Sequence, residues 1–151
     1  MSLPRFYSPF ALAIGSSVEL PSSAAHHAAK VLRMRVGDAL VLFDGRGGEY
    51  SASLEGIDKK RVVVSVNSHV DIERESPLAV TLVQAVASRD RMDVTLQKAV
   101  ELGVARIVPV MSQRSVVRLS GERADNRIAH WQQVAISACE QCGRNRVPQV
   151  E

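Results

Sequence analysis

The sequence predicts a protein of two domains, a small β-barrel at residues 1–72 followed by the first half of an α/β domain with a parallel sheet at residues 76–151. Two observations carry this prediction. Residues 1–75 hold nine Lys/Arg and nine Asp/Glu, whereas residues 76–151 hold ten against seven, and all aromatic residues except Trp131 lie in the first half. At residue 78, short alternating apolar runs also give way to a nearly continuous one, which is typical of buried parallel strands.

The first domain is predicted from three β-rich runs, residues 39–43, 49–54 and 62–66, and from the glycines that separate the first two. Residues 44–48 read Asp-Gly-Arg-Gly-Gly, as expected for a hairpin turn. A helix is expected from Ser22 or Ser23 through about Leu32, because a serine hydroxyl can accept hydrogen bonds from the free amides of the first turn.

The second domain is predicted from a strand, a helix and a strand in succession. Residues 78–86 are expected to be a strand covered on both faces, and Asp90 and Asp93 have the spacing of a helix capping box. Gly103 suits the end of that helix, and a strand at 107–111 follows, so the segment predicts a β-α-β unit with parallel strands. A longer helix ends at Gly143. Its expected core residues recur at spacings of three and four: Ile128, Trp131, Ala135, Ala138 and Cys142.

A further strand begins at residue 147, and the sequence ends at Glu151. Two strands and part of a third would leave an unpaired edge and a bare apolar face, which natural domains usually avoid. We therefore expect the chain to be part of a longer protein.

Several classes of function are disfavoured. No apolar run reaches the roughly 18 residues of a membrane span, and the N-terminus has no signal-peptide pattern, so we expect a cytoplasmic protein without membrane contact. Cys139 and Cys142 have the spacing of half a zinc site or of a redox pair. No histidine has matching ligand spacing, and the pair lies at a helix C-terminus, so two reduced core cysteines and no metal are expected.

Cationic residues in the second half suggest an anionic partner. Arg89 and Arg91 bracket a helix start, where the helix dipole disfavours positive charge. Arg144 and Arg146 follow a helix C-terminus, where the dipole accounts for them. A basic strip, which is either a polyanion site or a solvated face, contains Arg114, Arg118, Arg123 and Arg127.

Several motifs resemble the RsmE family, methyltransferases that modify N3 of a uridine in small-subunit ribosomal RNA. The resemblance spans essentially the whole chain. It is most specific in the segment Glu140-Gln141-Cys142-Gly143-Arg144-Asn145-Arg146-Val147-Pro148. Further matches are Arg5-Phe6, His26-His27, Val31-Leu32-Arg33-Met34-Arg35-Val36-Gly37-Asp38, Phe43-Asp44-Gly45, Arg91-Met92-Asp93, Gln97-Lys98-Ala99, Glu101-Leu102-Gly103-Val104 and Arg114-Ser115-Val116-Val117.

The resemblance implies a PUA-like RNA-binding barrel followed by the first part of a SPOUT-type methyltransferase domain. It implies S-adenosylmethionine as cofactor, bound by a C-terminal knot region that is absent here, so that this chain alone would be inactive. It also implies a homodimeric full-length protein, a role in ribosome biogenesis, and 16S ribosomal RNA or the small subunit as partner. The residues that we expect to bind RNA are Arg5, His27, Arg33, Arg35, Arg89, Arg91, Arg114, Arg118 and Arg146.

The catalytic hypothesis concerns Arg144, oriented by Glu140 one helical turn earlier. Uridine N3 must lose its proton, and a fixed cation near the base carbonyls would stabilise the negative charge that forms. An ordinary surface ion pair, worth a few tenths of a kcal/mol, is the plain alternative for these two residues. For the whole chain the alternatives are a non-catalytic RNA-binding module and a generic α/β interaction domain.

Overall fold

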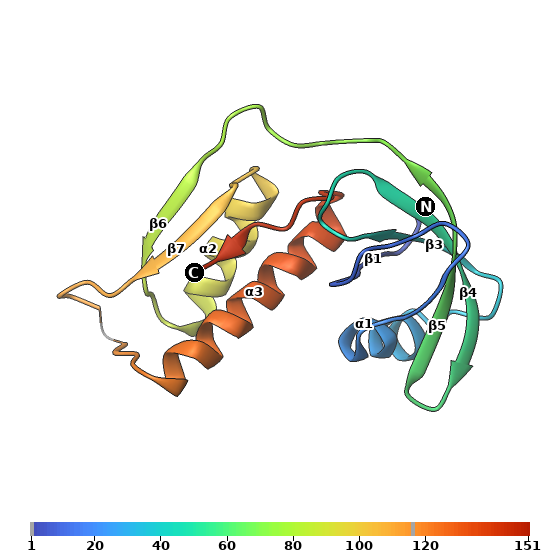
Figure 1. Cartoon of the computed structure of the whole chain (residues 1–151). Helices are drawn as coiled ribbons and strands as arrows, with labels where there is room; N and C mark the ends of the chain where they lie inside the picture. The colour runs from blue at the N-terminus through green and yellow to red at the C-terminus, as the bar shows by residue number, and fades with distance from the viewer. Residues whose placement is uncertain (1, 116) are drawn as a thin grey trace. The chain divides into compact units, whose positions relative to one another are not determined.

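The computed structural model describes residues 2–115 and 117–151, and of Arg89 only the backbone. The chain divides into two compact units, Met1–Arg74 and Glu75–Glu151, which are described separately below (Figure 1). Within the described ranges, no helix is both long enough and apolar enough to cross a membrane. Together the two units form a mixed α/β fold with one sheet in each unit.

The first unit is built on a five-stranded sheet in the order β1-β3-β4-β5-β2. β1 pairs with β3 in parallel, and the other neighbours are antiparallel. Two register shifts between β4 and β5 mark bulges, which bend a sheet and increase its twist. The three predicted strands are present, and two of them are longer than expected. The strands are β1 (Arg5–Tyr7), β2 (Ser17–Glu19), β3 (Ala39–Phe43), β4 (Glu49–Asp58) and β5 (Arg61–Val70).

A short helical segment packs against this sheet. α1 (Ser22–His26) continues into a turn of π-helix, η1 (His27–Val31), and their small side chains Ala24, Ala25 and Ala28 are buried with the apolar residues of the strands. The predicted serine cap is wrong. Pro21 occupies the N-cap position, no side chain caps the helix, and the Ala25 amide donates to the Pro21 carbonyl at 2.8 Å.

The second unit is a three-stranded parallel sheet in the order β6-β7-β8, joined by two long helices. The predicted β-α-β unit is therefore confirmed, and a second one follows it. Consecutive right-handed crossovers that move in one direction across a sheet put both helices on the same face, and α2 and α3 do pack together. The elements are β6 (Thr81–Ala85), α2 (Arg89–Glu101), β7 (Arg106–Val110), α3 (Glu122–Cys142) and β8 (Gln149–Val150).

Both helices end as the sequence predicts. Gly103 follows α2 with a φ of +94°, and Gly143 follows α3 with a φ of +86°, a conformation that glycine adopts without a steric penalty. The predicted capping box of α2 is wrong, because the helix begins at Arg89. Asp90 thus lies inside the first turn, and Asp93 pairs with His130 of α3 at 2.9 Å.

Only one face of the second sheet is covered among the described residues, in agreement with the bare apolar face expected from the sequence, so the strand predicted at 78–86 is not buried on both faces by these residues. Ile107 and its register partner Val150 are buried, whereas Val83 on the opposite face is 63% exposed. The core stripe of α3 is confirmed at Trp131, Ala135 and Ala138 and differs from the prediction at its end. Cys139 is buried on it, and Cys142 is exposed.

Candidate functional site

The most constrained cation of the second unit is Arg144, which is only 5% exposed. Its guanidinium contacts Glu75 through two hydrogen bonds, Nε to Oε1 at 3.1 Å and Nη2 to Oε2 at 2.6 Å. Nη1 donates to the carbonyls of Val100 and Val104, each at 2.9 Å. The side chain therefore joins the start of the unit to the end of α2.

The backbone around Gly143 makes these contacts possible. The left-handed conformation of Gly143 ends α3 and turns the chain back toward α2. The Val100 carbonyl belongs to the last turn of α2, where carbonyl groups lack helical partners and the helix dipole favours a cation. Arg144 thus donates hydrogen bonds both to carbonyl groups at the C-terminal end of α2 and to the carboxylate of Glu75.

The charge state of Arg144 is secure despite its burial. Burial disfavours the charged guanidinium, but the hydrogen bonds and the negative charge of Glu75 outweigh it, so the pKa of Arg144 is raised above its ordinary value. A planar guanidinium paired with a carboxylate through two bonds is a rigid arrangement. The site therefore holds a permanent positive charge in a fixed orientation.

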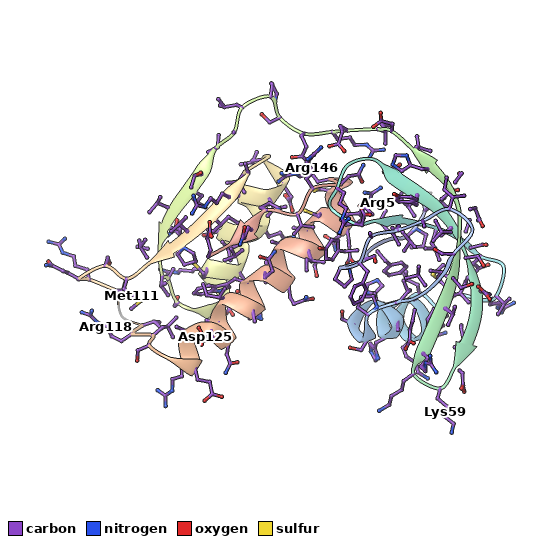
Figure 2. The ribbon with its side chains drawn as sticks, in the orientation of Figure 1. Arg5, Lys59, Met111, Arg118, Asp125 and Arg146 are labelled. Carbon is purple, nitrogen blue, oxygen red and sulfur yellow. The ribbon has the colours of Figure 1, made fainter. Side chains whose placement is uncertain are left out.

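The other residues of this motif lie in different environments. Glu140 is half-buried on the last turn of α3, and Arg146 is exposed in the segment before β8 (Figure 2). The Sγ of Cys139 lies 3.6 Å from the Arg146 carbonyl. The motif thus combines a buried cation with an exposed one two residues later.

The remaining predicted cations of this unit are spread over α2 and the loop before α3. Arg91 is exposed in the first turn of α2, and Arg114 and Arg118 are exposed in the loop. Arg118 donates to the Gln113 carbonyl at 3.3 Å, and Figure 2 shows it near the start of α3. The side chain of Arg89 lies outside the described part of the structure. Arg114 and Arg118 thus lie in one loop, whereas Arg91 lies on α2.

In the first unit, three of the predicted RNA-binding residues lie at the two ends of the π-helix, His27 at its start and Arg33 and Arg35 after its last residue. His27 is exposed on η1, with its ring 6.2 Å from that of Phe6. Arg33 and Arg35 are exposed on either side of Met34, which is buried. Arg33 has a φ of +53°, a left-handed conformation that is costly for a residue with a Cβ. The turn thus buries Met34 and leaves two cations at the surface.

Arg5 has a different setting from the other predicted RNA contacts. Its side chain is 11% exposed and pairs with Glu49 at 2.6 Å, and its guanidinium lies 5.1 Å from the Phe43 ring centroid. Arg74 binds the same carboxylate at 2.8 Å. These contacts lower the pKa of Glu49 to about 2, first through the hydrogen bond from Arg74 and, against the opposing effect of burial, also through Arg5. Arg5 is thus part of an ion-pair cluster within the first unit.

Glu75 is the site residue that the sequence analysis missed. It lies 69 positions before Arg144, in a segment that reads as a linker. No local pattern connects two residues at such a distance. An acidic residue a few positions before a predicted strand was the only available signal, and that signal is common.

Two hollows occur in the described part of the second unit. The first has room for about one water molecule, at about 10 Å³, next to Trp131. The second is an open groove of about 400 Å³ between α2 and α3, lined by the His130–Asp93 pair and by glutamine and apolar side chains. No group of three or more His, Cys, Asp or Glu among the described residues could hold a metal ion, and both cysteines are free thiols.

Each of the two units matches a known protein family. Residues 74–151 match the family described as an RNA methyltransferase domain, which covers just over half of the chain, and residues 20–67 match an RNA methyltransferase PUA domain. The chain belongs to this RNA methyltransferase family. The PUA-like and methyltransferase domains that the sequence resemblance implied are thereby confirmed.

Relatives of this RNA methyltransferase chain confirm the resemblance to RsmE. It is 32% identical over 149 residues to the ribosomal RNA small subunit methyltransferase E of Buchnera aphidicola from Acyrthosiphon pisum, covering 99% of this chain and 59% of the relative. The enzyme of the same name from Bacillus subtilis is 32% identical over 125 residues, which are 83% of this chain and 49% of the relative.

Solved structures that are similar to this chain are also described as methyltransferases. Ribosomal RNA small subunit methyltransferase E of Neisseria gonorrhoeae, bound to S-adenosyl methionine, is 49% identical with a TM-score of 0.93, covering 99% of this chain and 62% of that one. A Legionella pneumophila protein described as a methyltransferase in complex with S-adenosylmethionine is 39% identical with a TM-score of 0.96, over 100% and 62%. This RNA methyltransferase chain thus spans about half to six tenths of the length of these relatives.

Proposed function

We propose that this chain is the RNA-binding unit and the first part of the catalytic domain of an enzyme that methylates N3 of a uridine in 16S ribosomal RNA. The observation that carries the proposal is the joint match of both units to RNA methyltransferase domains, together with relatives named for small-subunit ribosomal RNA. A ribosomal substrate is also the reason for expecting a cytoplasmic enzyme with a role in ribosome biogenesis.

We propose that RNA phosphates are bound by exposed cations of both units. His27, the first residue of η1, and Arg33 and Arg35, which follow η1, are all exposed, as contacts with phosphates require. Arg91, Arg114, Arg118 and Arg146 are exposed on the second unit and are proposed to meet further phosphates, together with Arg89. The ion-pair cluster of Arg5 favours a supporting role for that residue, which holds β1 against β4. Because base pairing hides N3, the target uridine must be single-stranded or unstacked.

Arg144 and Glu140 remain our hypothesis for catalysis. The charge and fixed orientation of Arg144 suit stabilisation of a uridine anion. Its burial and its four hydrogen bonds favour a positioning role, in which Arg144 fixes residues 145–150 and the end of α2 around the reacting base. Direct contact with the base would require an exchange of one of these partners.

We propose that the described residues do not complete a site for S-adenosylmethionine. The hollow beside Trp131 is far too small, and the open groove is lined by side chains of α2 and α3 alone. We propose that the cofactor is bound by the part of the enzyme that corresponds to the remaining length of the relatives. The isolated chain would then be inactive, and the full-length enzyme would act as a homodimer.

The proposal is tested with protein of the relatives' full length, unmethylated small ribosomal subunits and S-adenosylmethionine with a labelled methyl group. N3-methyluridine, identified by mass spectrometry of the digested RNA, is the expected product. The 151-residue chain, titrated with S-adenosylmethionine in a calorimeter, should give no binding heat. RNA binding without methyl transfer by the full-length protein would favour the non-catalytic binding module instead.

The role of Arg144 is tested in the same assay with Arg144→Lys and Arg144→Ala. Lysine keeps the charge and loses the planar fork, so a catalytic contact predicts partial activity for Arg144→Lys at equal folded fraction. Lys60→Ala, an exposed cation in the β4–β5 turn, is the matched control. Loss of activity only in proportion to unfolding would contradict both the contact and the positioning role.

A further inference from the structure

Two loops of the first unit leave its sheet side by side. β1 and β3 are parallel, and their last residues, Tyr7 and Phe43, are register partners. Parallel strands end at the same edge of a sheet, so the loop after β1 and the turn after β3 begin next to each other. Phe10 lies three residues beyond Tyr7, and Arg46 lies three residues beyond Phe43.

The buried carboxylate of Asp44 ties these two loops together. Its side chain is 8% exposed, with Oδ2 accepting from the Leu12 amide and Oδ1 from the Arg46 amide, each at 3.1 Å. One carboxylate thus fixes the backbone within two residues of Phe10 and at Arg46 itself. The two side chains are therefore presented from a common anchor.

Each loop also has a second attachment. The Ser8 amide donates to the Phe43 carbonyl at 2.9 Å, and the Ser8 hydroxyl donates to the Phe10 carbonyl at 2.9 Å. On the other loop, the Gly48 amide donates to Glu73 Oε1 at 2.6 Å. The backbone that carries Phe10 and Arg46 is thus ordered before any ligand binds.

The side chains of Phe10 and Arg46 are exposed to solvent on this ordered backbone. Phe10 is 72% exposed, more than any other large apolar residue described in the first unit. Arg46 is exposed and makes no ion pair with a described residue. A phenyl ring and a guanidinium without an ion-pair partner, carried by two loops that share one anchor, match the two surfaces of a nucleotide, the face of the base and the phosphate.

We propose that Phe10 and Arg46 form a single-nucleotide contact for single-stranded RNA, with a base stacked on the Phe10 ring and a neighbouring phosphate bound by Arg46. This inference rests on the proposed RNA-binding function and adds two residues to it. Stacking tolerates any base, so the contact strengthens binding and positions the strand without reading its sequence.

The test measures the affinity of the 151-residue chain for fluorescein-labelled oligouridine by anisotropy at several salt concentrations. Phe10→Ala should weaken binding by about 5- to 100-fold with an unchanged salt slope, since stacking releases no counterions. Arg46→Ala should reduce the slope of log affinity against log salt by about 0.7. Ile57→Ala and Lys60→Ala, an exposed apolar residue and an exposed cation elsewhere on the same unit, should change neither quantity.

Two further variants separate stacking from general apolar contact and from misfolding. Phe10→Leu keeps an apolar side chain without a ring and should bind almost as weakly as Phe10→Ala. Phe10→Trp should keep full affinity, and RNA should quench the fluorescence of the new indole, because a base would stack on it. The natural Trp131 should not respond to RNA in this way, since it is 3% exposed and belongs to the other unit. Thermal unfolding midpoints of all variants should match that of the parent chain.

The outcomes distinguish this inference from the function on which it rests. If the parent chain binds oligouridine and Arg33→Ala weakens it, but Phe10→Ala behaves like Ile57→Ala, the nucleotide contact alone is wrong. If the parent chain shows no salt-dependent affinity, both the RNA-binding function and the contact fail. A change in sedimentation with unchanged RNA affinity in Phe10→Ala would assign Phe10 to a protein contact and overturn the inference.

Discussion

Arg144 and Glu75 form a buried ion pair, with Nη2 2.6 Å from Oε2, between residues that are 69 positions apart. The pair connects the first residue of the second unit to the segment that follows α3. The same guanidinium also binds two carbonyls at the end of α2. One side chain therefore fixes three segments of the unit to each other.

Arg144→Ala should lower the free energy of unfolding of the second unit by about 3–5 kcal/mol, because it leaves a half-buried carboxylate and two carbonyls without their cation. Urea denaturation monitored by Trp131 fluorescence measures this loss. Arg146→Ala, two residues later at an exposed position, should cost at most about 0.5 kcal/mol. Equal effects of the two substitutions would show that the buried pair contributes nothing specific.

Arg33→Gly should stabilise the first unit while weakening RNA binding. Glycine relieves the left-handed strain at φ +53°, by about 1 kcal/mol, and the same change removes a proposed phosphate contact. Lys59→Gly is the matched control, since Lys59 has a φ of +49° at the tip of the β4–β5 hairpin (Figure 2). For Arg33→Gly the thermal unfolding midpoint should rise and the RNA affinity should fall. For Lys59→Gly the midpoint should rise and the RNA affinity should stay the same.

The stability of the first unit should depend on the ionisation of Glu49. The pKa of this carboxyl is about 2 in the folded protein against an ordinary value of 4.5, so its stabilising effect is fully present above about pH 4.5 and is lost as the pH falls toward 2. The difference in unfolding free energy between the parent chain and Glu49→Gln, measured from pH 6 to pH 2, should shrink over this window. A difference that is constant with pH would contradict the ion-pair cluster.

Gly48→Ala should destabilise the first unit much more than Gly15→Ala. Both glycines have positive φ, +66° and +84°, so both substitutions carry a similar backbone penalty of about 1 kcal/mol or more. A Cβ at Gly48 would lie 2.4 Å from Nε2 of His69 and 2.6 Å from the Val70 carbonyl oxygen, whereas nothing lies within 4 Å at Gly15. The difference between the two unfolding midpoints thus measures the steric contact, and equal midpoints would show that the Val70 strand moves aside freely.

Patterns that act over a few residues could be predicted from the sequence. Gly103 and Gly143 end their helices because a left-handed residue after a helix favours glycine, and that preference is local. The strand-helix-strand order of the second unit followed from the apolar run at residues 78–86 and the stripe of α2. The motif around Arg144 carried the family resemblance, which the matches to RNA methyltransferase domains confirm.

The errors arose where neighbouring segments decide the outcome. The helix at Ser22 begins without a serine cap because Pro21 supplies its start, and Asp93 pairs across to α3 instead of capping α2. Cys142 has the right spacing for the core, but the orientation of α3 in its contact with α2 buries Cys139 instead. Spacing fixes a helical face only to within a residue or two, and packing selects among those residues.

The sequence by itself determined the order of elements in the second unit, the division into two units and the family, since these depend on residue type and spacing along the chain. The short strands β1 and β2 of the first unit were not predicted. Tertiary structure alone decided that Glu75 is the partner of Arg144, and that Phe10 and Arg46 share the anchor Asp44. The reason is physical. Such pairings depend on how the chain folds back on itself, and a hydrogen bond between residues tens of positions apart leaves no periodic trace in the sequence.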